Sequence, residues 1–452
     1  MNKYEYWFKD NKSNILADYF HFLRFPTVSS DSKAFLAMKN CVNWLEAFLS
    51  GMGLKVEIWK TDGWPVIFAE FKSEAIDAPT VLIYHHYDVQ PVDPLHLWDQ
   101  DPFEPYLKDG YVYARGALDN KGQCFYSLSA LKAFLSLNPR PSFNIKILIE
   151  GEEESGTENT SKIIGQKVES LKADHVLIVD MDLKEEGVPT ITLGLRGMIG
   201  LEIECINSFF DLHSGTHGGI ALNPNKVLVD LLAKLWNEDG SIAIEGFYES
   251  IQSCSYFKEL DHDFDRSAYS RTFGVKAFHY KENVSPSEAN WLLPTIEING
   301  LHGGYGGEGM KTVIPKKAVA KLSCRLVPGQ NPDKIAESVK NFLLKNVPSG
   351  IDLNIIIHKG GQAYRGKKEH PFISLVANAY ETVFSRPCCY VLSGASVPIV
   401  SQLNQVTEGE CVLIGCGLAS DNIHSPNERF SLSRFEQGFY LISNIMESLE
   451  KS

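Results

Sequence analysis

The amino-acid sequence predicts an α/β protein with a mixed, mostly parallel sheet between helices and an inserted α+β domain. Short apolar runs alternate with helical patterns over residues 1–189 and again over 362–452, which is typical of a sheet covered on both faces. Residues 190–361 contain longer alternating strands instead. The chain of 452 residues also exceeds the size of one hydrophobic core. We therefore expect a first domain made of 1–189 and 362–452, interrupted by a second domain.

The first segment contains alternating helix and strand patterns. Two helices are expected between residues 14 and 53, where Gly51 and Gly53 supply stop signals. Further elements follow in this order: strands VEIWK from 56, VIFAEF from 66 and TVLIYHHYD from 80, a helix from Asp119 to about Leu137, a strand from Phe143 to Ile149, a helix around Ser161 to Leu171, and a strand HVLIVDMD over 175–182.

Acids and histidines gather where three of these strands end. The ends carry the pairs His86 and Asp88, Glu153 and Glu154, and Asp180 and Asp182. Ligand sites of open α/β sheets lie at the carboxyl ends of their strands. The stretch FNIKILIEGEEESGT places four carboxylates in five positions, and such crowding favours a bound cation. An isolated acidic run is more often a solvated turn, so the repetition at three strand ends is what favours a metal site.

The inserted domain and the last segment complete the pattern. Strands are expected at TITLGLRGMIGLEIECI, AVAKLSCRLVP and IDLNIIIH, with one amphipathic helix around Val227 to Leu235 and another after Asn331-Pro332. The last segment has a helix from Pro371 to Phe384, strands at CCYVL and ECVLIGC, and a final helix with a capping box of Ser433 and Glu436.

Composition excludes several classes of partner. A formal net charge of −13 argues against nucleic acid and anionic membranes. We find no apolar run long enough for a signal peptide or a membrane span. The nine cysteines are scattered and form no C-x-x-C pair, as expected for reduced thiols in the cytoplasm. The ligands of any metal are therefore expected to be nitrogen and oxygen atoms.

Six residues are the candidates for a two-metal site with a general base: His86, Asp119, Glu153, Glu154, Asp180 and His424. Each is ordinary alone, since an aspartate at a strand end more often caps a helix. Asp88 lies on the same strand face as His86 and could orient its imidazole, whereas His85 faces the other way and is expected to be structural.

Two other motifs are weak. GGYGGEG at 303–309 contains G-x-G-x-x-G, but Pro315 follows too soon for the helix that a dinucleotide site needs. The segment from Gly394 to Pro398 lacks the last glycine of a nucleophile elbow, so a serine hydrolase is not favoured.

Six motif regions then carry a family resemblance: HYDVQP (86–91), ARGALDNKG (114–122), EGEEESGT (150–157), GLRG with DLHSG (194–197 and 211–215), KTVIPKKAVAKLSCRLVP (311–328) and DNIHSPNE (421–428). In this order they resemble the co-catalytic metallopeptidase family of carnosinase-type dipeptidases, aminoacylases, desuccinylases and glutamate carboxypeptidases. The resemblance covers essentially the whole chain and is greatest to the dipeptidase branch.

The resemblance implies a zinc-peptidase-like catalytic domain that holds two divalent metal ions, Zn²⁺ or Mn²⁺. His86 and Asp180 would bind one ion, Glu154 and His424 the other, and Asp119 would bridge them. On this basis residues 1–189 and 362–452 are the two parts of the catalytic domain, and 190–361 is a dimerisation or lid domain.

The resemblance also implies roles around the metals. Glu153 would be the general base that activates a metal-bridging water, and Asp88 would support His86. His213 would polarise the scissile carbonyl in the active site of the partner subunit of a homodimer. The carboxylate end of the substrate would be held by Arg325 and Ser396, with Thr312 nearby. Leu392 stands where relatives commonly have arginine, which leaves the substrate preference open.

We therefore expect a cytoplasmic metallopeptidase that hydrolyses short peptides, chiefly dipeptides with a free C-terminal carboxylate. An N-acyl amino acid deacylase or desuccinylase with the same dinuclear site is the alternative. A peptide-binding homologue without activity is a third hypothesis, and the intact Glu153 argues against it because binding needs no base.

Overall fold

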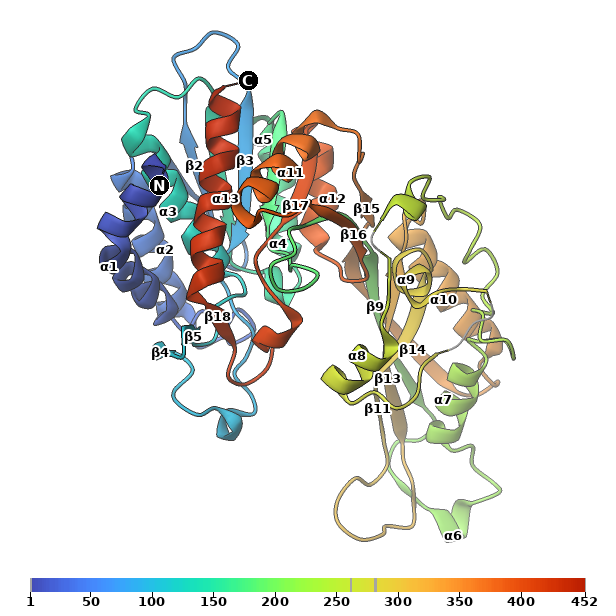
Figure 1. Cartoon of the computed structure of the whole chain (residues 1–452). Helices are drawn as coiled ribbons and strands as arrows, with labels where there is room; N and C mark the ends of the chain where they lie inside the picture. Colours follow the sequence, from blue (N-terminus) through green and yellow to red (C-terminus); the bar gives the residue numbers. More distant parts are fainter. Residues whose placement is uncertain (1, 261, 280–282, 452) are drawn as a thin grey trace. The chain divides into compact units, whose positions relative to one another are not determined.

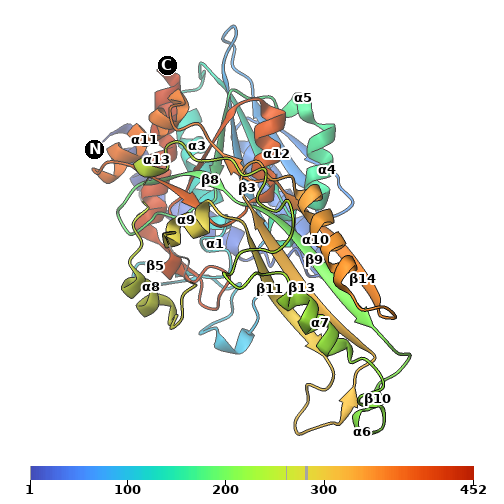
Figure 2. The ribbon, with the colours of Figure 1, turned by 90° about the vertical axis from the view of Figure 1, so that its right-hand side faces the viewer.

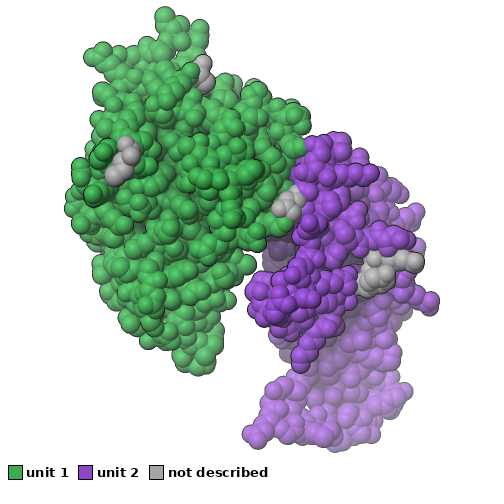
Figure 3. Space-filling view, viewed as in Figure 1, with its two compact units in different colours: residues 1–194, 366–391, 399–452 green, residues 195–365, 392–398 purple. Residues whose placement is uncertain are grey.

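The computed structural model describes residues 2–260, 262–279 and 283–451. The chain forms two compact units, which Figure 3 colours separately. Unit 1 comprises Met1–Gly194, Gly366–Val391 and Ile399–Ser452, and unit 2 comprises Leu195–Arg365 and Leu392–Pro398. Unit 1 is thus built from segments on both sides of unit 2 in the sequence.

A central sheet organises unit 1 (Figure 1), with the strand order β1-β2-β6-β3-β7-β17-β8 and β16 paired to β8. Its strands are β1 (Lys55–Trp59), β2 (Val66–Phe71), β3 (Thr80–His86), β6 (Asn144–Glu150), β7 (His175–Val179), β8 (Thr190–Leu195), β16 (Cys389–Ser393) and β17 (Glu410–Ile414). The central strands β6, β3, β7 and β17 are parallel to their neighbours in that group. β1, β2 and β8 pair antiparallel.

The central strands are buried on both faces, because their sequences are nearly continuous apolar runs. Six of the seven residues of β3 and of β6 are buried. The helices of unit 1 are α1 (Lys3–Leu23), α2 (Phe35–Gly51), α3 (Lys121–Leu137), α4 (Glu158–Gln166), α5 (Val168–Leu171), α11 (Pro371–Phe384), α12 (Pro398–Thr407) and α13 (Leu432–Glu450). α3 and α13 lie on one side of the sheet and α4, α5 and α12 on the other (Figure 2). The predicted α/β class is confirmed.

Three local predictions in unit 1 are wrong. The first helix begins at Lys3, well before residue 14, because Asn2 and Glu5 form a capping box there. The helix expected around Ser161 to Leu171 is broken into α4 and α5 at Lys167. The last helix begins after Ser431, whose side chain makes no capping hydrogen bond. Ser433 and Glu436 both lie inside this helix, so the capping box predicted for them is absent.

A small three-stranded sheet in unit 1 brings together two distant sequence segments, each of which adjoins a motif with predicted metal ligands. It has the order β18-β5-β4 and consists of β4 (Tyr106–Lys108), β5 (Tyr111–Tyr113) and β18 (Arg429–Ser431). The 3₁₀ turns of unit 1 are η1 (Leu95–Leu97), η2 (Glu153–Ser155) and η4 (Ala419–Asp421). β18 pairs with β5 directly after residues 421–428, so this sheet brings the DNIHSPNE motif beside the ARGALDNKG motif.

Unit 2 is an antiparallel sheet with two helices on one face. The sheet has the order β11-β13-β9-β14. Its strands are β9 (Gly197–Ile206), β11 (Thr295–Gly303), β13 (Lys317–Leu326) and β14 (Asp352–Gly361). Residues of β9 alternate strictly between buried and half-buried, as a strand with one covered face requires. The covering helices are α7 (Pro224–Ala233) and α10 (Pro332–Asn346), and α10 begins at Asn331-Pro332 as predicted.

The remaining elements of unit 2 are short: β10 (Leu212–His213), β12 (Val313–Ile314), β15 (Tyr364–Arg365), α6 (Ser214–His217), α8 (Arg266–Phe273), α9 (Pro286–Trp291) and η3 (Phe257–Glu259). β10 and β12 form a separate two-stranded ribbon. Among the described residues, no helix combines the length and the apolar sequence that crossing a bilayer requires.

Candidate metal centre

Three neighbouring parallel strands of unit 1 end at the same edge of the central sheet. β3 ends at His86, β6 at Glu150, and β7 at Val179, directly before Asp180. β3 lies between β6 and β7 and is parallel to both, so the three carboxyl ends meet. The predicted convergence of acids and histidines on one edge of the sheet is therefore present.

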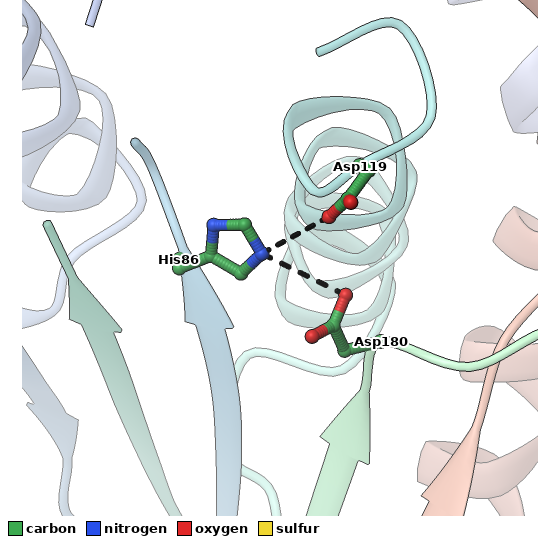
Figure 4. A group of neighbouring side chains, drawn as sticks. All are labelled: His86, Asp119 and Asp180. Atoms are coloured by element: carbon green, nitrogen blue, oxygen red, sulfur yellow. Dashed lines mark hydrogen bonds and ion pairs between the residues drawn. The ribbon is translucent and has the colours of Figure 1, made fainter. Parts of the chain in front are cut away.

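The first metal group consists of His86, Asp119 and Asp180 (Figure 4). The Nε2 atom of His86 lies 3.2 Å from Oδ1 of Asp119 and 3.8 Å from Oδ1 of Asp180. Asp119 comes from the loop before α3, whereas the other two residues come from the ends of β3 and β7. The three side chains thus present one nitrogen and two carboxylate oxygens to a shared point.

The second metal group consists of Asp119, Glu154 and His424. The Nε2 atom of His424 lies 2.9 Å from Oδ2 of Asp119 and 3.3 Å from Oε2 of Glu154. Asp119 therefore belongs to both groups and uses a different oxygen in each. One carboxylate shared between two ligand sets is the arrangement that a bridging ligand in a two-metal site requires.

Charges in the two groups are strongly coupled. Hydrogen bonds to Asp119 and then Glu154 raise the pKa of His424 to about 10. Burial alone would lower the pKa of His86, but Asp180 and the other neighbouring carboxylates raise it well above its usual range. The neighbouring acids thus favour the protonated, positively charged form of both imidazoles. A divalent cation would supply that positive charge and take the same nitrogen lone pairs.

Glu153 lies beside both metal groups and belongs to neither. Burial, reinforced by the nearby carboxylates of Asp180 and Glu154, raises the pKa of Glu153 well above its usual range. Burial and Asp119 likewise raise the pKa of Glu154 to about 7. A carboxyl outside the ligand sets with a raised pKa is suited to accept and return a proton.

The donor atoms also fit a cation on geometric grounds. The Oε1 atom of Glu154 is buried and makes no hydrogen bond within the part of the chain that the structure describes. An unpartnered buried carboxylate oxygen is costly, and coordination to a cation would satisfy it. Together with the crowded acids, this unpartnered oxygen indicates that the residues present fit divalent metal ions.

Asp88 connects the first strand end to the acidic turn. Its carboxylate lies 3.3 Å from Nδ1 of His86 and accepts hydrogen bonds from the backbone N–H groups of Glu153 and Glu154, at 3.2 and 3.0 Å. The expected contact with His86 is present. The contacts with the acidic turn were not predicted, because the sequence gives no indication of backbone donors 65 residues away.

Two polar residues near the centre, Asn120 and Gln90, were not singled out from the sequence. Asn120 donates hydrogen bonds to Oδ1 of Asp180 at 2.6 Å and to Val179 O, while its own oxygen contacts Nδ1 of His85 at 3.1 Å. Gln90 donates to Oε2 of Glu154 at 2.7 Å. His85 is fully buried, as expected of a structural residue. All of these residues lie in or beside the motifs, but only the structure gives their partners.

The four predicted substrate residues all belong to unit 2 and form two pairs. Arg325 donates from Nη1 to Oγ of Ser396 at 2.9 Å. The segments of His213 and Thr312 meet in the β10-β12 ribbon, where the N–H of Ser214 donates to Thr312 O at 3.1 Å. The His213 side chain is exposed, and its Nδ1 accepts from the N–H of Gly215 at 3.0 Å.

An arginine that was not predicted supports the loop that carries Ser396. Arg196, from the GLRG motif, is buried and donates from Nε to Gly394 O at 2.9 Å, while its backbone N–H donates to Ala395 O at 3.0 Å. Leu392, the departure noted in the sequence, is only 4% exposed. Its side chain is therefore not presented to solvent.

Comparison with known proteins relates these features to a family. Residues 82–448 match the family described as Peptidase family M20/M25/M40. A Beta-Ala-His dipeptidase from Rattus norvegicus is 28% identical over 399 residues, which cover 86% of this chain and 80% of that protein. The matched range includes all six residues predicted for the metal site.

Two solved structures share the fold over nearly the whole chain. The M20 family metallo-carboxypeptidase Sso-CP2 from Sulfolobus solfataricus has a TM-score of 0.90 and 30% identity, and the match covers 97% of this chain and 99% of that one. The di-peptidase Dug1p from Saccharomyces cerevisiae has a TM-score of 0.87 and 25% identity, with 100% and 98% covered. These matches confirm the resemblance expected from the motifs.

The shared position of Asp119 leads to a prediction about metal content. Asp119→Asn weakens a ligand of both groups, so we expect the purified variant to lose metal from both sites. His424→Ala removes a ligand from the second group alone, so about one equivalent should remain. Elemental analysis after dialysis against limiting Zn²⁺ measures both results.

His370→Ala is the matched control, because His370 caps α11 and belongs to neither group. Equal metal content in Asp119→Asn and the wild type would contradict the shared-ligand arrangement.

Proposed function

Because the chain belongs to peptidase family M20/M25/M40, we propose that it is a metal-dependent dipeptidase acting on dipeptides with a free C-terminal carboxylate. The observation that carries the proposal is Asp119, which is common to two ligand groups while Glu153 stands beside both. The names of the rat and yeast relatives support a dipeptide substrate. They do not favour the deacylase alternative.

The proposed cofactors are two Zn²⁺ or Mn²⁺ ions, one in each metal group. The donors are histidine nitrogens and carboxylate oxygens, a set that suits these two ions. When bound, such cations polarise a carbonyl group and lower the pKa of a water molecule. His86 and Asp180 would hold one ion, Glu154 and His424 would hold the other, and Asp119 would contribute to both.

In the proposed mechanism Glu153 moves the proton. It takes a proton from the attacking water as the oxygen approaches the amide carbon, and then gives it to the departing amine. The Asp88 carboxylate accepts a hydrogen bond from the backbone N–H of Glu153. This contact fixes the backbone position from which the Glu153 side chain extends. Gln90 and Asn120 orient the carboxylates of Glu154 and Asp180 beside it.

His213 is proposed to stabilise the negative charge that develops on the carbonyl oxygen. Its Nδ1 accepts backbone hydrogen bonds from Gly215 and Thr216. In the neutral ring the proton is therefore on Nε2, which is free to donate to an oxyanion. Arg325 and Ser396 are proposed to bind the substrate's carboxylate, with Thr312 beside His213.

Unit 2 is proposed to form a homodimer in which His213 completes the partner's site. Large apolar side chains close to His213 in the sequence are exposed in the single chain: Phe209 at 98%, Ile220 at 81% and Phe210 at 67%. Exposed apolar residues of this size are typical of a protein interface.

The expected cytoplasmic location is retained as a prediction, supported by six cysteines that are buried inside the units.

We predict that Glu153→Gln abolishes turnover and leaves the metals in place. The amide cannot accept the proton, so dipeptide hydrolysis should fall by at least about 100-fold. Mass spectrometry of a panel of dipeptides, tripeptides and N-acyl amino acids measures turnover, and elemental analysis measures metal. Glu169→Gln, which removes an exposed acid on α5, is the control.

Near wild-type turnover of Glu153→Gln would remove Glu153 from the mechanism. Cleavage by the wild type that is confined to N-acyl compounds would replace the dipeptidase with the deacylase.

We predict that two inactive variants restore activity when their subunits mix. A dimer of one Glu153→Gln and one His213→Ala subunit contains one complete site, made of Glu153 from one subunit and His213 from the other. Random pairing in an equal mixture should return about a quarter of the wild-type activity. The measurement is dipeptide hydrolysis after the mixture is dissociated and reassembled.

No gain over the separate variants, with mixed dimers demonstrated by mass spectrometry, would contradict a role of His213 in the partner's site.

A further inference from the structure

Glu428, at the end of the DNIHSPNE motif, has a fully buried carboxylate that accepts four hydrogen bonds. Its Oε2 accepts from Nη1 of Arg115 and from the backbone N–H of Gly116, both at 2.8 Å. Its Oε1 accepts from the backbone N–H groups of Leu118 and Asp119, at 2.9 and 3.0 Å. Both oxygens are therefore fully used.

All four donors belong to one stretch of five residues that ends at Asp119, the residue common to both metal groups. The Glu428 carboxylate thus fixes the backbone of the loop from which the Asp119 side chain projects. Glu428 also follows His424 by four residues, so it ties the segment that carries one ligand to the segment that carries another.

We propose that Glu428 is a positioning residue for the metal centre: it holds Asp119 between the two metal groups and so sets the affinity of both. The inference rests on the metal site of the proposed function. Residues that orient metal ligands from outside the coordination sphere commonly change metal affinity by about 10- to 100-fold.

A carboxylate is required at this position by the donors around it. Four N–H groups point at two oxygens, and none of the four can accept a hydrogen bond. A glutamine would replace one oxygen with an NH₂ group, which would then face donors on both sides. Either the pair of Arg115 and Gly116 or the pair of Leu118 and Asp119 would lose its acceptor. The loop that bears Asp119 would shift in either case.

Two neighbouring residues show why the effect of Glu428 should differ from that of an ordinary orienting residue. Gln90 contacts Glu154, a member of the second metal group only. Asn120 contacts Asp180, a member of the first group only. Loss of either side chain should weaken one site, whereas loss of the Glu428 carboxylate should weaken both.

The test is Zn²⁺ titration of the metal-free full-length protein against a competing fluorescent chelator. For Glu428→Gln we expect both binding steps to weaken by at least about tenfold. For Gln90→Ala we expect only one step to weaken. Glu447→Gln is the control, because Glu447 accepts from Tyr4 and pairs with Lys3 near the chain ends, outside both groups. Its two steps should equal those of the wild type.

Thermal unfolding of the metal-free proteins separates this role from simple structural support. A Glu428→Gln variant that has a lower Tm but wild-type affinity at both steps would overturn the proposal. Loss at one step only would also overturn it. If Glu428→Gln does not fold, Glu428→Asp keeps the charge one methylene further from the N–H groups, and unchanged affinities in that variant would equally contradict the role. A wild-type protein that binds no Zn²⁺ would instead remove the proposed metal site itself.

Discussion

The carboxylate of Asp119 lies between two histidines that come from distant parts of the chain, and the rest of the centre depends on that position. His86 reaches Oδ1 from the end of β3, and His424 reaches Oδ2 from a loop more than 300 residues later. Two more carboxylates, Glu154 and Asp180, complete the two groups. So many acids at one point are tolerable only with compensating positive charge, which is what a divalent metal pair supplies.

The fold supplies this arrangement through a few rigid elements. Parallel pairing of β6, β3 and β7 brings three strand ends to one edge, so His86, the acidic turn and Asp180 converge. The small sheet of β18 and β5 brings the C-terminal motif beside the loop of Asp119. Asp88 and Glu428 then fix the turn and the loop through backbone N–H groups. Ligands placed on rigid elements and held by buried acceptors need little rearrangement to bind metal.

The sequence predicted the α/β class and the approach of acids and histidines at one edge of the sheet, where the structure groups His86, Asp119 and Asp180. It did not predict the start of α1 or the break between α4 and α5. An apolar run that ends in acids can be recognised within a short stretch of sequence. The assignment of each ligand to one of the two metal ions came from the family motifs. The hydrogen-bond partners could not be predicted in the same way. Glu428 contacts residues about 310 positions away, and the side-chain orientation of Asn120 depends on His85 and Asp180 together. The early start of α1 is set by the capping box of Asn2 and Glu5, and the buried face of the helix also extends back to Tyr4 and Phe8.

The most direct test of the shared carboxylate is the anomalous diffraction of crystals grown with Zn²⁺ or Mn²⁺, recorded on both sides of the metal absorption edge. The shared carboxylate predicts two anomalous peaks about 3.5–4 Å apart, one coordinated by each oxygen of Asp119, with His86 beside the first and His424 beside the second. A single peak, or two peaks that do not share Asp119, would contradict it.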